Sequence, residues 1–193
     1  YRPQDHPRSR LLDALEAGAA APRPLRGFKK PDLIPGHPDL YDQQPDADTI
    51  AGALTKWASE WGKPWIVVDT HPGASPAAHG ALAVANIVLA PTALRTAELD
   101  ATAELVNEAA DYPLVIVPNF VPTTPPAAEI QRLRSIIANT PVQVAPPIPT
   151  ALHVGTRKKR IAITAEAPPA KSLQKVAAAL TDLSTFVKEY VNG

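Results

Sequence analysis

The chain has 193 residues, and its 19 Lys and Arg side chains balance 19 Asp and Glu side chains, so overall charge predicts no polyanionic partner. The absence of cysteine excludes disulfides, thiol catalysis and cysteine-ligated zinc or iron–sulfur sites. No apolar run approaches membrane-spanning length, so we expect a cytoplasmic protein with no membrane association. The length suits one core, and we expect a single domain over residues 1–193.

The predicted elements alternate between helices and strands. Amphipathic periodicity and capping residues predict helices over residues 9–18, 46–62, 76–85, 96–110, 126–138 and 169–191. Short, apolar, β-branched runs predict strands over 65–69, 86–90, 113–118 and 142–146, with a further short strand in 31–36. This order predicts an α/β fold: an open, mostly parallel twisted sheet with helices on both faces.

Ligands of open α/β sheets bind at the carboxyl ends of the strands, and the first candidate there is Asp69. A carboxylate at a strand end can bind Mg²⁺, directly or through water. The small residues that follow, Thr70 to Gly73, would let backbone N–H groups approach a γ-phosphate. Equally, Asp69 is consistent with a residue that only caps the next turn.

Two further candidates follow later strands. The amide of Asn119 both donates and accepts, so it could read an adenine edge, although Asn after a strand also forms local turns. Pro147 and Pro149, in "APPIPTALHV", could wall a base pocket or simply stiffen a loop.

One segment of this balanced chain is strongly basic. "GTRKKR" places Arg157, Lys158, Lys159 and Arg160 in succession, where a DNA backbone could bind, although such a run is also typical of a solvated surface. The five histidines show no metal-ligand spacing. Ser75, His79 and Asp69 lack the Gly-x-Ser-x-Gly context of a serine hydrolase.

In combination, these motifs resemble the ParA/MinD family of deviant-Walker P-loop ATPases, most of all small plasmid-partition ParA proteins. "WIVVDTHPG" is similar to the family's strand ending in Asp-Thr-Pro-Pro-Gly, and "ALAVANIVLAPTALRTAELDATAELV" to the block that follows. "LVIVPNF" resembles the strand whose Asn contacts adenine, "PPIPTALHV" the loop beyond it, and "PDLIPGHPDL" an early family strand. The resemblance covers roughly residues 31–190.

The opening "YRPQDHPRSRLLDAL" resembles a chain that begins inside the family's Asp-x-Asp-Pro-Gln motif, with Pro3 and Gln4 as Pro-Gln. Because the sequence also contains no methionine, we expect it to omit an N-terminal stretch holding the family's phosphate-binding loop, and some internal positions. Arg2 replaces the family's second Asp, His71 replaces a Pro, and Asn86 replaces the common Asp.

The resemblance implies a P-loop NTPase-like ATPase for DNA partition or cargo positioning. The protein would bind Mg²⁺ and ATP, or ADP after hydrolysis. Asp69 would be the catalytic acid and would bind the metal. The residues around the nucleotide would be Asn119, Pro147, Pro149, Thr70 and Gly73. An ATP-dependent homodimer would bind DNA non-specifically at the nucleoid, through Arg157, Lys158, Lys159 and Arg160, and a ParB-like partner would stimulate hydrolysis. The alternatives are a non-hydrolysing ParA-like binding module, which Arg2 favours, and a related P-loop ligase or kinase of small molecules.

Overall fold

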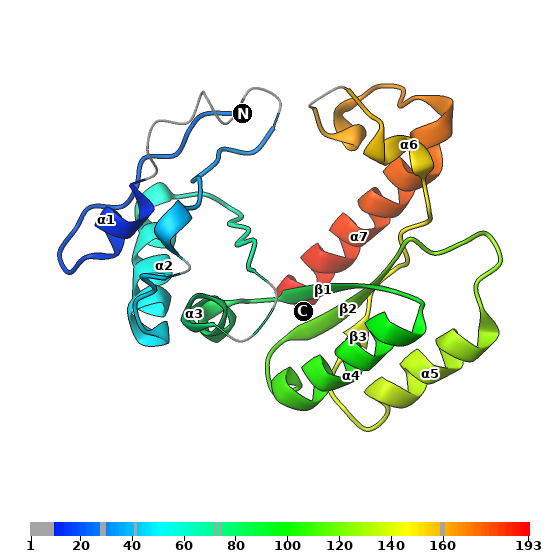
Figure 1. Ribbon diagram of the computed structural model, residues 1–193. Helices are drawn as coiled ribbons and strands as arrows, with labels where there is room; N and C mark the ends of the chain where they lie inside the picture. Colours follow the sequence, from blue (N-terminus) through cyan, green and yellow to red (C-terminus); the bar gives the residue numbers. More distant parts are fainter. Residues whose placement is uncertain (1–9, 28–29, 41, 72, 74, 159–160) are drawn as a thin grey trace. The chain divides into compact units, whose positions relative to one another are not determined.

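The computed structural model describes residues 10–27, 30–40, 42–71, 73, 75–158 and 161–193 (Figure 1). The chain divides into two compact units, Tyr1–Ala85 and Asn86–Gly193, and each is described by itself. The single domain expected over residues 1–193 therefore stays a prediction.

The first unit is helical. It contains α1 (Leu11–Leu15), a short 3-10 helix, η2 (Pro38–Leu40), then α2 (Ala47–Trp61) and α3 (Pro76–Val84). Asp46 starts α2, because its carboxylate accepts the backbone N–H of Thr49 at 2.7 Å, and Gly62 ends it in a left-handed conformation. The apolar stripe predicted from the sequence places Ile50 and Trp57 in the interior of this unit.

The predicted strand over residues 65–69 is not formed. Residues 65–70 are irregular and exposed, and no strand in the described part of the chain pairs with them. The strand predicted within 31–36 is reduced to one antiparallel bridge between Leu25 and Leu33. Both predictions were wrong for the same physical reason: a strand exists only where a neighbour accepts its backbone hydrogen bonds.

The second unit is an α/β sheet with crossover helices. Its strands are β1 (Val88–Ala93), β2 (Leu114–Asn119) and β3 (Gln143–Val144), ordered β1-β2-β3 and parallel throughout. β1 pairs with β2 from Val88↔Leu114 to Ala93↔Asn119. The connections contain α4 (Thr96–Ala109) and α5 (Ala127–Ile137), as the alternation of strands and helices predicted.

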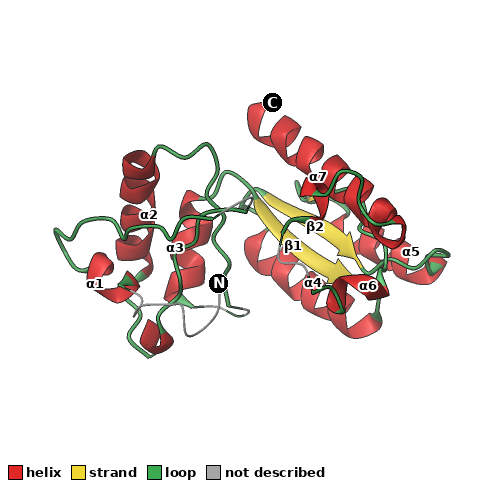
Figure 2. Cartoon of the chain, turned by 90° about the horizontal axis from the view of Figure 1, so that it is seen from above, coloured by secondary structure: helices red, strands yellow, loops and turns green. Residues whose placement is uncertain are grey.

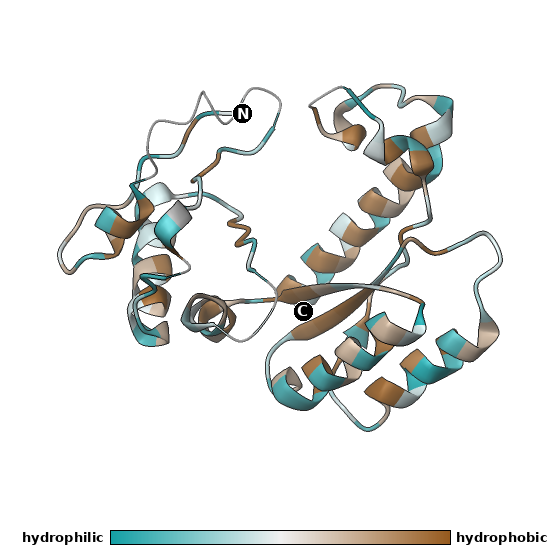
Figure 3. Cartoon of the chain, viewed as in Figure 1, coloured by the Kyte–Doolittle hydropathy of each residue, from teal (hydrophilic) through white to brown (hydrophobic). Residues whose placement is uncertain are grey.

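Alternate residues of β2 face two different cores. Leu114 and Ile116 pack with residues of α4 and α5, whereas Val115 and Val117 pack with Leu183, Phe186 and Tyr190 of α7 (Gln174–Asn192). Figure 2 shows the sheet between these helices, and Figure 3 shows that the helices carry both hydrophobic and hydrophilic residues along a hydrophobic sheet. The prediction of parallel strands with helices on both faces is thus confirmed for this unit.

The helical segments between β3 and α7 are short. They are α6 (Leu152–Gly155) and the 3-10 helices η3 (Ile163–Ala165) and η4 (Lys171–Leu173), and η4 leads directly into α7. Among the described residues, no helix combines the length and apolar character needed to cross a membrane.

Candidate functional site

The carboxyl ends of the parallel strands lie at one edge of the second unit, and two loops form a wall there. Beyond β2, Val121 forms a parallel bridge with Pro149. The N–H of Ile148 donates to the carbonyl of Pro118 at 2.8 Å, and that of Val121 donates to the carbonyl of Ile148 at 3.0 Å. The hydroxyl of Thr150 also donates to the carbonyl of Phe120. Backbone bonds of this kind fix the two loops against each other.

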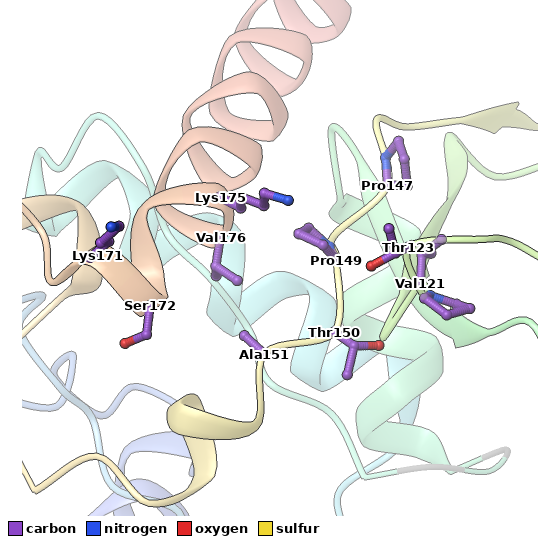
Figure 4. Close-up of a pocket in the computed structure, with 11 residues that line it drawn as sticks. Val121, Thr123, Pro147, Pro149, Thr150, Ala151, Lys171, Ser172, Lys175 and Val176 are labelled. Carbon is purple, nitrogen blue, oxygen red and sulfur yellow. The ribbon is translucent and has the colours of Figure 1, made fainter.

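A cavity of about 540 Å³ opens beside this wall (Figure 4). It is lined by residues within 121–123, 147–151 and 171–176, so the loop after β2, the loop after β3, η4 and the start of α7 all contribute. Pro147 and Pro149, the residues predicted to wall a base pocket, both line it. The cavity has both polar and apolar lining residues and lies at the carboxyl edge of a parallel sheet, where α/β proteins bind ligands.

Asn119 ends β2 and is half-buried, but it does not line this cavity. Its Oδ1 accepts the backbone N–H of Phe120 at 2.9 Å, and Phe120 has a positive φ of 53°. The amide therefore supports the turn after the strand, which is the local role that the sequence left open. Its contact with adenine stays a prediction.

Asp69, Thr70 and Gly73 belong to the first unit, where Asp69 and Thr70 are exposed in an irregular segment and Gly73 has a φ of 106°. Within the described ranges, no three His, Asp or Glu side chains gather in a way that could hold a metal ion. Mg²⁺ binding by Asp69 thus stays a prediction, in which a single carboxylate would bind the metal ion. Ser75 caps α3 by accepting the N–H of Ala78, which gives this serine a structural role.

The basic segment contains residues with different surroundings. The guanidinium of Arg157 pairs with the carboxylate of Glu166 at 2.7 Å and donates to the carbonyl of Ile161, and the Arg157 side chain is only 13% exposed. Lys158 is exposed. Lys159 and Arg160 lie outside the described residues, as do Arg2, Pro3 and Gln4. Of the predicted DNA-binding cations, Arg157 is therefore already engaged inside the unit.

Sequence reasoning missed the cations of the cavity. Lys171 and Lys175 line it from η4 and from the start of α7, and Thr123 lines it from the loop after β2. A signal was available, because the two lysines lie at the amino end of a predicted helix, where cations are unfavourable. Their meeting with Pro147 and Pro149 depends on tertiary structure and could not be read from spacing.

Comparison with known proteins gave no match: no family model, curated protein or solved structure is similar to this chain. What the site can bind is therefore inferred from its own residues.

Proposed function

We propose that this protein is a ParA-like ATPase, with a P-loop NTPase-like fold, that positions DNA or another cargo. It binds ATP with Mg²⁺, forms a homodimer, binds DNA non-specifically at the nucleoid, and hydrolyses ATP when a ParB-like partner engages it. The observation that carries the proposal is the cavity at the carboxyl edge of β2 and β3, with Pro147 and Pro149 in its wall.

The architecture of the second unit supports nucleotide binding. β1, β2 and β3 are parallel and consecutive, and their crossovers contain α4 and α5. In such sheets, the loops after the strands are brought together at one edge, where ligands bind. In the proposal the cavity receives the nucleotide. The contact of Asn119 with adenine comes from the resemblance and stays a prediction, because Asn119 does not line the cavity. The roles predicted for Asp69, Thr70 and Gly73 toward Mg²⁺ and phosphate concern the first unit and stay predictions.

A non-hydrolysing ParA-like binding module is the second candidate. The observation in its favour is the environment of Asp69, an exposed carboxylate in an irregular segment rather than at the end of a strand. Phosphoryl transfer depends on metal ions and on fixed positive charge around the γ-phosphate. A module with weak metal binding at Asp69 would bind nucleotide or DNA without turnover.

The test is equilibrium binding of fluorescent ATP with Mg²⁺, followed by ATP turnover with and without plasmid DNA. We expect Asn119→Ala to weaken ATP binding about tenfold, because two hydrogen bonds to the adenine edge are lost. Asn107→Ala, at an exposed position of α4, is the matched control. Turnover that DNA stimulates supports the ATPase, and nucleotide binding without turnover supports the module. No nucleotide binding contradicts the ATPase and leaves only a module that binds DNA.

DNA binding is tested best at Lys158. Charge reversal at Arg157 would break its buried pair with Glu166 and destabilise the protein by about 3 kcal/mol. A loss of DNA binding in that variant could then result from unfolding. We expect Lys158→Glu to weaken DNA retention and to reduce the dependence of binding on salt by about one phosphate contact. Filter retention of duplex DNA across salt concentrations measures both effects. If the variant retains DNA as well as the wild type does, Lys158 is not part of the surface that binds DNA.

A further inference from the structure

The cavity beside Pro147 and Pro149 has a positively charged rim. Lys171 and Lys175 line it, and no Asp or Glu residue does. Among the ion pairs of the described residues, none includes either lysine. The chain as a whole has no excess of positive charge, so this local concentration differs from the average surface.

Two polar residues that line the cavity, Lys175 and Thr123, lie on the same side of it. Figure 4 shows the side chain of Lys175 extending from α7 toward Pro149, on the side where Thr123 also lies. Lys171 and Ser172 point to the other side of the helix start. Lys175 and Thr123 line the same cavity, and an ammonium group and a hydroxyl are both donors that suit an oxyanion.

A role in stabilising α7 does not explain these lysines. The first turn of α7 contains no acidic residue, and Lys171 and Lys175 lie at the amino end of a 19-residue helix. Helix dipoles favour anions at this end and disfavour cations. An anion bound beside Lys175 would be attracted both by its ammonium group and by the helix dipole.

We propose that this cavity binds a phosphate-bearing ligand, with phosphate oxygens accepting hydrogen bonds from the Lys175 ammonium and the Thr123 hydroxyl. Apolar parts of the ligand would lie against Pro149, Val121 and Val176, which also line the cavity. This inference deepens the proposed function and rests on it for the identity of the ligand as a nucleotide. The phosphate groups can belong to a free nucleotide or to a DNA backbone, and the experiment separates these sources.

The experiment is calorimetric titration of the protein with sodium tripolyphosphate, ATP and a short DNA duplex in parallel. We expect Lys175→Gln to weaken tripolyphosphate binding about tenfold, because one charge-assisted hydrogen bond is lost. Thr123→Val should weaken it less, and added salt should weaken binding to the wild type. Lys188→Gln is the matched control, because Lys188 is an exposed residue of α7 that does not line the cavity.

The outcomes separate the phosphate site from the proposed function. A Lys175-dependent loss with ATP alone identifies a free nucleotide, and the same loss with the duplex identifies the DNA backbone; both support the site. No tripolyphosphate binding, or equal losses in Lys175→Gln and Lys188→Gln, overturns it. If Lys175 is needed for tripolyphosphate but ATP neither binds nor turns over, the site stands and the proposed function fails. If Lys175→Gln binds tripolyphosphate, the duplex and ATP like the wild type and still turns over ATP, the site fails and the proposed function stands.

Discussion

Two apolar stretches of similar composition adopt different structures in this molecule: one is an exposed irregular segment and the other is a buried strand. Residues 65–69, "WIVVD", belong to the first unit, and residues 114–118, "LVIVP", form most of β2 in the second. Val67 is 90% exposed, whereas Ile116 is fully buried. The difference lies in their neighbours, since β2 has parallel partners on both sides and helices on both faces. Strand composition alone does not make a strand.

The two units are also stabilised in different ways. In the second unit, β2 joins two apolar cores across one sheet, and the buried Thr92 and Thr102 hydroxyls satisfy each other at 2.8 Å. The first unit depends on the packing of α2 against α3 and on local polar contacts. All three tryptophans lie within residues 57–65, so tryptophan fluorescence reports on the first unit alone.

The largest expected effect sharpens the contrast between the two apolar stretches. Ile116→Ala should lower the free energy of unfolding of the second unit by about 2–5 kcal/mol, because it leaves a cavity in the centre of β2. Val67→Ala should change stability by less than about 0.5 kcal/mol, because Val67 is exposed. Urea unfolding followed by circular dichroism measures both variants. A comparable loss in Val67→Ala would show that residues 65–69 are paired in solution.

A second prediction concerns the packing of α2 on α3. A Cβ at Gly80 would lie 2.6 Å from the Ala47 carbonyl oxygen and 2.8 Å from Cβ of Ile50, so Gly80→Ala should cost about 1–3 kcal/mol. Gly52→Ala is the matched control, because Gly52 faces open space within α2. This control should stabilise the first unit by about 0.5–1 kcal/mol. Relative to the wild type, the unfolding transition detected by tryptophan fluorescence should shift to lower stability in Gly80→Ala and to higher stability in Gly52→Ala. A shift in the same direction in both variants would contradict the close approach at Gly80.

Sequence reasoning succeeded where local signals and tertiary structure agree. The periodicity of 96–110 and 126–138 predicted α4 and α5, and the strand ending at Asn119 was placed within one residue. β1 begins two residues later than predicted and extends to Ala93, because its pairing with β2 continues that far. β3 is only Gln143–Val144, although Ala145 still donates to the carbonyl of Ile116.

The remaining features depend on contacts that are distant in sequence. Pro147 and Pro149 were recognised as a possible wall, but Lys175 and Thr123 reach the same cavity from segments far away in the chain. Similarly, Arg157 belonged to a uniform basic run in the sequence, yet its pairing with Glu166 separates it from Lys158. Residue type predicts what a side chain can bind, whereas folding decides which partner it meets first.

The smallest expected effect is a pH dependence in the stability of the first unit. The Lys63 ammonium, bonded to Asp32 at 2.8 Å, and the Gly27 N–H lower the pKa of the Asp32 carboxyl below its usual 3.8. The Thr49 N–H does the same for the pKa of Asp46, which caps α2. Because these folded-state pKa values are lowered, the stabilisation is present above pH 3.8 and is lost as the pH falls through the folded-state values.

Thermal unfolding detected by tryptophan fluorescence, repeated at falling pH, measures this loss. Asp32→Asn should remove part of the pH dependence, and Asp46→Asn should remove another part. Salt should weaken the contribution of Asp32, whose partner is a charged ammonium, more than that of Asp46, whose partner is a backbone amide. Both carboxylates are exposed to solvent, so each shift of the melting temperature should be small. If Asp32→Asn melts with the same pH profile as the wild type, the Lys63 contact is not maintained in solution.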